Sequence, residues 1–343
     1  MGNSFPELAK KRIAGGITAN DIAAAMLYIC FAVYLYGYGE YFVLCGLYTT
    51  TAAWGTYFIS KRWISNWTPS FFAGAVYGFG PFALSFELFH SLAGLSFAMV
   101  PWLLLPAVYW HKGKTPDAFR FCIRALLTLL PFGGIVLLFW VTAQPWAGPN
   151  FLMSKALCMT VKDFADLIFP LHKSGCIVPF GLYHCPLILA LMGVFVYIKL
   201  QRIALLIPIA AGLVLSFWEP VFQVTPIVWA AFPILFLSLL CGVGFQAMVS
   251  AGKADSKWVM TCGVFASVLA AFFGAMAIRI IDPFRTTFEV TALIYTLTAV
   301  GVWITLFFIH AFPRQHTPRW LLLTAVMMVD LLYSAHYLTD QLF

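Results

Sequence analysis

Residues 70–112 of this 343-residue chain read SFFAGAVYGFGPFALSFELFHSLAGLSFAMVPWLLLPAVYWHK. Glu87 and His90 interrupt an otherwise apolar run and divide it into two segments. An ionisable residue at membrane depth is costly unless it faces a bundle interior or a water-filled cavity. Because Glu87 and His90 are three residues apart, they share one face of a helix. The stretch predicts an antiparallel pair of helices that turns near residues 87–91.

The composition of the whole chain is that of a membrane protein. It is 62% hydrophobic and 10% charged, with a mean hydropathy of +0.90, whereas a soluble domain is about 45–50% apolar and about 25% charged. Apolar runs of about 17–25 residues follow one another with short polar breaks, as in spanning helices, and the short alternating segments of a barrel do not occur. The prediction is an all-α, polytopic helical bundle that forms a single transmembrane domain over residues 1–343.

We predict about eleven spans. They cover residues 21–38, 41–60, 70 to the turn at 87–91, that turn to 110, 121–143, 178–200, a helix ending at 218, 224–248, a helix ending at 279, 286–312 and 319–343. Glycine and proline at residues 78–81 and 131–134 predict breaks within two of them.

The distribution of positive charge predicts the topology. With residues 1–20 as a retained cytoplasmic leader, five of the 20 Lys and Arg residues fall outside and the rest inside; the five are Lys155, Lys162, Lys173, Arg279 and Arg285. This bias places the N-terminus inside and the C-terminus outside, in what we expect to be a bacterial cytoplasmic (inner) membrane. The net charge of +7 is scattered between spans, which argues against nucleic acid as a partner.

Residues 144–177 form the one substantial outer loop. Leu157, Val161, Phe164 and Ile168 recur at helical spacing, which predicts an amphipathic helix at the outer interface; a lid or docking surface is the alternative. Cys158 and Cys176 are predicted to form a disulfide in an oxidising compartment. A metal site made of His172, Cys176, His184 and Cys185 is the weaker alternative, since the spacing matches no standard pattern.

Asp330 lies about ten residues into the last apolar segment, near the predicted bilayer midplane. A lone ionised Asp there costs roughly 2.5–3.5 kcal/mol, so it must be protonated, paired or next to water. Two interpretations stay open. Asp330 is either a proton or ion relay site or the buried structural hydrogen-bond partner of a Ser, Thr or Tyr on a neighbouring helix.

Glu87, His90, His336 and Asp340 lie at similar outer depth and are the candidates for catalysis or metal binding. Their residue types suit zinc or iron, but the E-x-x-H pattern occurs once, whereas a di-iron bundle needs a second copy. The sequence does not indicate whether the two helices that carry them touch. No cofactor is predicted, and the motifs of ATP hydrolysis, serine hydrolysis and thiol relay do not occur.

Three functions remain open. The first is a transporter, or channel-like carrier, of an ion or small solute, with an acidic outer vestibule formed by Glu40, Glu87, Asp163, Asp166, Glu219, Asp282, Glu289 and Asp340; solvated turns are the simpler explanation of these acids. The second is a non-catalytic membrane subunit bound to other envelope proteins in the bilayer. The third is an enzyme acting on a lipid or lipid-linked substrate at the outer leaflet, with Glu87 or Asp340 as general base.

Overall fold

The computed structural model describes residues 18–37, 42–64, 66–109, 117–143, 158–171, 180–199, 206–221, 224–279 and 285–342. Regular structure in these residues is helical, and the sole extended pairing is an isolated bridge between Val221 and Val224. The all-α prediction is therefore confirmed for the described part of the chain.

The α-helices share apolar sequences and differ in length. They are α2 (Ala19–Tyr36), α3 (Phe42–Lys61), α4 (Trp67–Gly78), α5 (Pro81–Phe89), α6 (Ser91–Tyr109), α7 (Asp117–Thr142), α8 (His184–Lys199), α9 (Leu206–Phe217), α10 (Ala231–Ser250), α11 (Ser256–Arg279), α12 (Arg285–Ala311) and α13 (Thr317–Leu342). The 3-10 helices among the described residues are η3 (Val161–Leu167), η5 (Pro226–Ala230) and η6 (Lys253–Asp255). Within the described residues, six helical stretches are long and apolar enough to cross a membrane: α2, α6, η5 with α10, η6 with α11, α12 and α13.

One of the two predicted helix breaks is confirmed. Helix α4 ends at Gly78, and Pro81 occupies the first position of α5, where its missing N–H costs nothing. The hydroxyl of Tyr183 donates to the carbonyl of Phe79 within this break (3.0 Å). The predicted break at residues 131–134 is wrong, since α7 continues through Pro131; a proline removes one hydrogen bond and can be accommodated inside a long helix. The predicted turn before α6 lies at His90.

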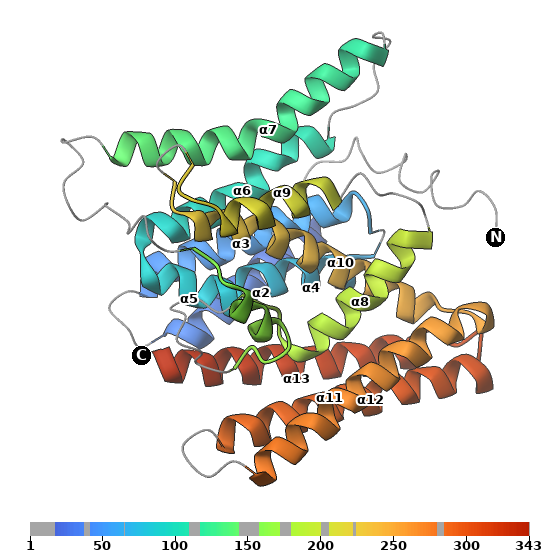
Figure 1. Cartoon of the computed structure of the whole chain (residues 1–343). Helices are drawn as coiled ribbons and strands as arrows, with labels where there is room; N and C mark the ends of the chain where they lie inside the picture. Colours follow the sequence, from blue (N-terminus) through green and yellow to red (C-terminus); the bar gives the residue numbers. More distant parts are fainter. Residues whose placement is uncertain are drawn as a thin grey trace.

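The centre of the bundle is built on a very close crossing of α8 and α10. A Cβ atom on Gly244 would lie 1.8 Å from the carbonyl oxygen of Leu189, and one on Gly193 would lie 2.1 Å from that of Leu240. Only glycine permits such an approach of two backbones, a common device in membrane bundles. Figure 1 shows α7 along one side of the bundle and the α11–α12 hairpin along the opposite side, with α10 between them.

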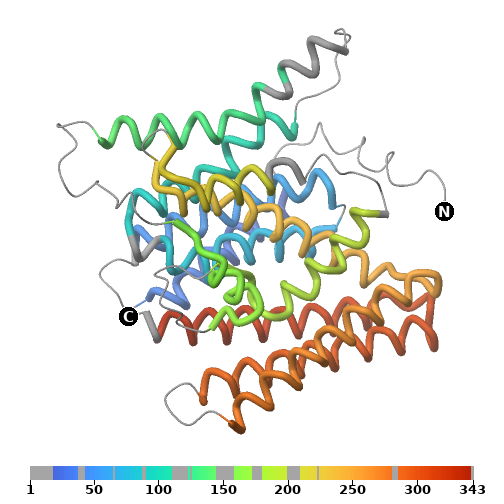
Figure 2. Tube along the Cα trace, in the orientation of Figure 1, coloured from blue at the N-terminus to red at the C-terminus, as the bar shows by residue number. Residues whose placement is uncertain are grey.

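Helix α11 is apolar on both its faces. Val259, Cys262 and Ala266 face the protein, whereas Met260 and Val268 are exposed. A helix that is hydrophobic all round belongs in a large core or in a membrane. At the edge of the bundle, where Figure 2 places it, this pattern indicates a membrane-integral protein.

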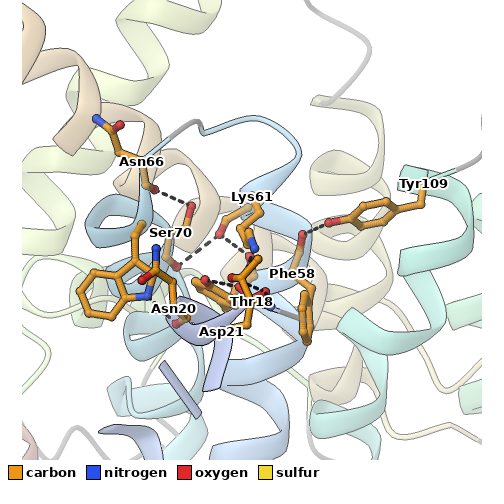
Figure 3. Close-up of polar contacts among 11 residues, drawn as sticks. Thr18, Asn20, Asp21, Phe58, Lys61, Asn66, Ser70 and Tyr109 are labelled. Atoms are coloured by element: carbon orange, nitrogen blue, oxygen red, sulfur yellow. Dashed lines mark hydrogen bonds and ion pairs between the residues drawn. The ribbon is translucent and has the colours of Figure 1, made fainter. Parts of the chain in front are cut away.

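One end of the bundle, which we call the Lys61 end, is held by polar contacts between helix termini (Figure 3). Trp67 donates to the carbonyl of Asn20 (2.8 Å), and Tyr109 donates to that of Phe58 (2.7 Å). The side chain of Asn66 donates to that of Gln246 (2.7 Å). These contacts place the start of α2 and α4 and the end of α6 and α10 together.

Arg319 joins the start of α13 to this same end. Its buried guanidinium donates to the backbone carbonyls of Gln315, Ala251 and Pro313 at 3.0, 2.8 and 2.8 Å. These acceptors follow α10 and α12, where terminal carbonyls lack intrahelical donors. We call the opposite end the His336 end. There the rings of Tyr34 and His336 pack together, with their centroids 5.6 Å apart.

The segment predicted as the outer loop differs from the prediction in its helix type. Residues 161–167 form the 3-10 helix η3, closed by Asp163, which accepts from the backbone N–H of Thr160 (2.6 Å). Asp163 and Asp166 are buried, whereas Val161 is 80% exposed. The predicted apolar stripe thus faces outward and the carboxylates face the protein, because the side-chain cap and the following Phe169 fix the segment against the bundle. Leu157 lies outside the described residues.

Candidate functional site

Asp330 lies at the middle of α13, and its side chain is fully buried. It is thirteen residues from the start of the helix, or about 20 Å. Met327, Leu331 and Ser334 are buried beside it, so Asp330 occupies the face of α13 that packs on the bundle.

Helix α8 begins directly against this carboxylate. The backbone N–H of Cys185, in the first turn of α8, donates to Oδ2 of Asp330 (2.6 Å). The first N–H groups of a helix lack intrahelical acceptors and carry the positive end of its dipole. Because the residues that precede α8, Phe180, Leu182 and Tyr183, are also buried, α8 starts inside the bundle rather than at its surface.

His184 and Ser334 complete the set of donors around Asp330. Nδ1 of His184 is 3.0 Å from Oδ1, and the hydroxyl of Ser334 donates to the same oxygen (2.8 Å). In the Nδ1–H tautomer, His184 is the third donor to this carboxyl, beside the N–H of Cys185 and the hydroxyl of Ser334. We assign that tautomer from the hydrogen-bond pattern.

The second ring nitrogen of His184 differs from the first. Nε2 is buried and has no hydrogen-bond partner among the described residues. In the Nδ1–H tautomer, Nε2 carries a lone pair and can accept a proton. A proton on Nε2 adds a positive charge beside the carboxyl of Asp330, and in a low-dielectric interior such a change in charge is a large electrostatic event.

The sequence anticipated half of this site. Ser334 supplies a structural hydrogen bond from the helix of Asp330 itself, whereas the prediction placed such a partner on a neighbouring helix, and His184 supplies a titratable partner. His184 was instead grouped with His172, Cys176 and Cys185 as a candidate metal cluster. His172 and Cys176 lie outside the described residues. The available signal was a histidine at the start of an apolar run, but its distance of 146 residues from Asp330 hid the pairing.

The other candidate residues are not brought into one cluster in the described part of the chain. Helices α5 and α13 do pack together. His336, however, pairs with Asp340 on its own helix (Nε2 to Oδ2, 3.5 Å), and both side chains are more than half exposed. Nδ1 of His90 accepts from the N–H of Leu92 (3.1 Å) at the start of α6, and the side chain of Glu87 lies outside the described residues.

Metal and disulfide sites remain predictions. Within the described residues, no group of three or more His, Cys, Asp or Glu is placed to hold a metal ion. Cys158 is an exposed free cysteine, and Cys176 lies outside the described residues, so the predicted disulfide receives no support.

The acids of the predicted vestibule have local partners or lie elsewhere. Asp163 and Asp166 are buried in the protein, and Glu289 pairs with Arg285 (2.8 Å). Glu219 is exposed, while Glu40 and Asp282 lie outside the described residues. An acidic vestibule therefore has less basis than the buried aspartate at the centre.

A second buried carboxylate, Asp21, lies at the Lys61 end (Figure 3). Its Oδ1 accepts from Nζ of Lys61 (2.5 Å) and from the hydroxyl of Tyr57 (2.7 Å), and its Oδ2 accepts from the N–H of Thr18 (2.9 Å). The last contact caps α2. Sequence analysis did not predict this ion pair, which joins two helices across 40 residues.

Comparison of the chain with protein-family models, curated proteins and solved structures finds no match.

Proposed function

We propose that this protein is a membrane transporter, or channel-like carrier, of an ion or small solute, in which His184 and Asp330 bind and release a proton. The observation that carries the proposal is the buried carboxylate of Asp330, held by three donors, beside an imidazole whose Nε2 has no partner among the described residues. Ionisable residues inside a membrane are costly and mark ion or proton pathways.

The discontinuous helices around the site support this proposal. Helix α8 begins inside the bundle at His184, and the break between α4 and α5 is bonded to the neighbouring Tyr183. Transporters often build substrate and ion sites from interrupted helices near the midplane, where helix N-termini face anionic groups. Asp330 is such a group for α8. This support rests on the similarity between these interrupted helices and those of transporters.

We infer further that all eleven apolar segments span the membrane, with the Lys61 end in the cytoplasm of a bacterial cell. The contacts that unite the ends of α2, α3, α4, α6, α10 and α13 agree with the alternation that charge predicts. Reporter proteins fused after residues 62, 112 and 343 test the topology. A reporter that is active only in the cytoplasm should be active after residues 62 and 112, and one that is active only outside should be active after residue 343. The opposite result at any of these positions would refute the topology.

Proton flux is the direct test of the function. The purified protein is reconstituted in liposomes that contain a pH-sensitive dye, and valinomycin with a potassium gradient supplies the driving force. We expect flux above that of empty liposomes and a decrease of at least about tenfold in Asp330→Asn, since one relay group is worth at least about 1.4 kcal/mol of barrier.

Asp340→Asn is the matched control, because Asp340 is an exposed carboxylate on the same helix. It should leave flux unchanged. Thermal unfolding of Asp330→Asn in detergent checks that the variant is folded. Full flux in a folded Asp330→Asn variant, or no flux in the native protein, would contradict the proposed function.

A further inference from the structure

One face of α12 carries a line of buried polar side chains. Thr287, Thr291, Tyr295 and Thr298 are at most 6% exposed. Their spacing of three or four residues places them on one face of the helix. The line begins near the His336 end, where α12 starts, and extends to the middle of the bundle. It is unusual in a helix whose other buried residues are mostly apolar.

One of these hydroxyls differs from other threonines of the chain. A helical threonine commonly donates to the carbonyl four residues earlier, as Thr296 and Thr305 do at 2.7 and 2.8 Å. The hydroxyl of Thr298 has the thiol of Cys185 as its neighbour, whereas Oγ1 of Thr291 is buried and has no partner among the described residues. Buried polar groups are normally satisfied by protein or by ordered water. Oγ1 of Thr291 therefore points to hydration.

His184 lies against this face of α12. Its ring contacts that of Tyr295 edge to face, with centroids 4.8 Å apart. Thr291 is one turn before Tyr295, toward the His336 end, and about 6 Å from it along α12. Nε2 of His184 and the hydroxyl of Thr291 are thus two buried polar groups, about one helical turn apart, without a partner among the described residues.

The polar line continues to the His336 end. Thr287 shares a hydrogen bond with the hydroxyl of Tyr337 (3.1 Å). Arg285 and Glu289, two residues to either side of Thr287, are exposed, as are His336 and Asp340 on α13. Charged side chains at the surface are hydrated, so water is present where the line begins.

We propose that α12, α13 and the start of α8 enclose a hydrated path by which protons pass between the His336 end and Nε2 of His184. The use of the path rests on the proposed function, whereas its hydration does not. Water bound at Thr291 bridges its hydroxyl to the imidazole. A hydronium ion gives its proton to Nε2, leaving water and an imidazolium; the reverse transfer regenerates the neutral ring. No other bond changes in either direction.

The electrostatics of the path are set by Asp330. The other titratable groups that interact with it are Tyr183, Cys185, Cys241 of α10 and Tyr295 of α12. All four are neutral in their protonated forms. Among these neighbours, only His184 gains a positive charge on protonation, so the proton that arrives along α12 is held at Nε2.

Cysteine reactivity tests the hydration without any assumption about transport. Thr291→Cys and Thr305→Cys are near-isosteric, and Thr305 is a matched control because it is buried on the same helix and bonded to its own backbone. Both variants in liposomes are treated with 2-aminoethyl methanethiosulfonate, and mass spectrometry of each peptide quantifies the reaction. Thiolates form where water reaches, so position 291 should react at least about tenfold faster than position 305.

Proton flux supplies the second measurement. Thr291→Val should lower flux severalfold, whereas Thr305→Val should not. If the native protein conducts protons, but both cysteines react equally slowly and Thr291→Val conducts normally, the path is refuted and the proposed function stands. If position 291 reacts rapidly but the native protein conducts no protons, the path stands and the proposed function is refuted.

Discussion

The two buried aspartates of this protein are compensated in opposite ways. Asp21 lies at the Lys61 end, where Lys61 is 28% exposed and supplies a permanent positive charge. Asp330 lies at the middle of α13, where His184 is fully buried and supplies a positive charge only when Nε2 is protonated. The first pair joins helix ends and is suited to stability. The second is a carboxylate whose compensation depends on a proton, which is the property that a relay needs.

The largest expected difference is in stability. Asp330→Leu leaves the N–H groups of Cys185 and His184 without their acceptor inside the bundle, and each buried donor left unsatisfied costs about 1–3 kcal/mol. Asp21→Leu leaves an ammonium that can reach water at the helix end, for a loss on the order of 1–2 kcal/mol. Titration with SDS in mixed micelles measures both free energies of unfolding. An equal or larger loss of unfolding free energy in Asp21→Leu would show that the pair of Asp330 and His184 does not contribute more to stability than the pair of Asp21 and Lys61.

A substitution at Gly244, which belongs to neither site, should affect the Asp330 site but not the Asp21 site. In Gly244→Ala, the new methyl group meets the carbonyl of Leu189, and such overpacking costs about 1–3 kcal/mol. It also displaces α8, and with it His184, while Asp21 keeps its contacts. We expect lower stability together with lower proton flux, measured in the same preparations.

Gly133→Ala is the matched control for this experiment. A Cβ atom on Gly133 would have no atom within 4 Å among the described residues, and alanine favours the helix by up to about 1 kcal/mol. Stability should be unchanged or slightly higher. A Gly244→Ala variant as stable as Gly133→Ala would contradict the close crossing of α8 and α10.

The smallest effect comes from giving the Asp21 pair the chemistry of the Asp330 pair. In Lys61→His, the imidazole is charged below its ordinary titration range near pH 6.5 and neutral above it. Because Asp21 favours the charged ring, the stabilisation is present at pH 5.5 and is lost as the pH rises above that range. We expect the variant to lose on the order of 1 kcal/mol relative to the native protein between pH 5.5 and pH 8.

SDS titrations of Lys61→His and of the native protein, at both pH values, measure this difference. The native pair serves as the reference, since lysine stays charged throughout this range. A loss that is the same at both pH values would mean that residue 61 stabilises through packing rather than charge.

The sequence predicted those features that depend on local pattern. Apolar runs located the helices, Gly80 and Pro81 located the break before α5, and counting residues along the last segment located Asp330 within the bundle. Each depends on residues within a few turns of one another, where composition and backbone chemistry decide the outcome.

The features that sequence did not predict depend on distant contacts or on the balance between competing local terms. His184 reaches Asp330, and Lys61 reaches Asp21, only after the helices have packed. Pro131 was expected to interrupt α7, but the helix continues through it. The acids of η3 were expected to face water, yet Asp163 and Asp166 turn toward the protein, because their segment is fixed against the bundle.

The crossing of α8 and α10 has a mechanical consequence. Where Gly193 and Gly244 bring the two backbones into contact, α8 has no room to approach farther, so the contact acts as a pivot. His184 is nine residues from Gly193, which is a lever arm of about 13 Å, and a tilt of about 5° therefore moves it by about 1 Å. A hydrogen bond of 3.0 Å does not survive such a displacement. The tilt of one helix and the contact that holds the proton are thus geometrically coupled.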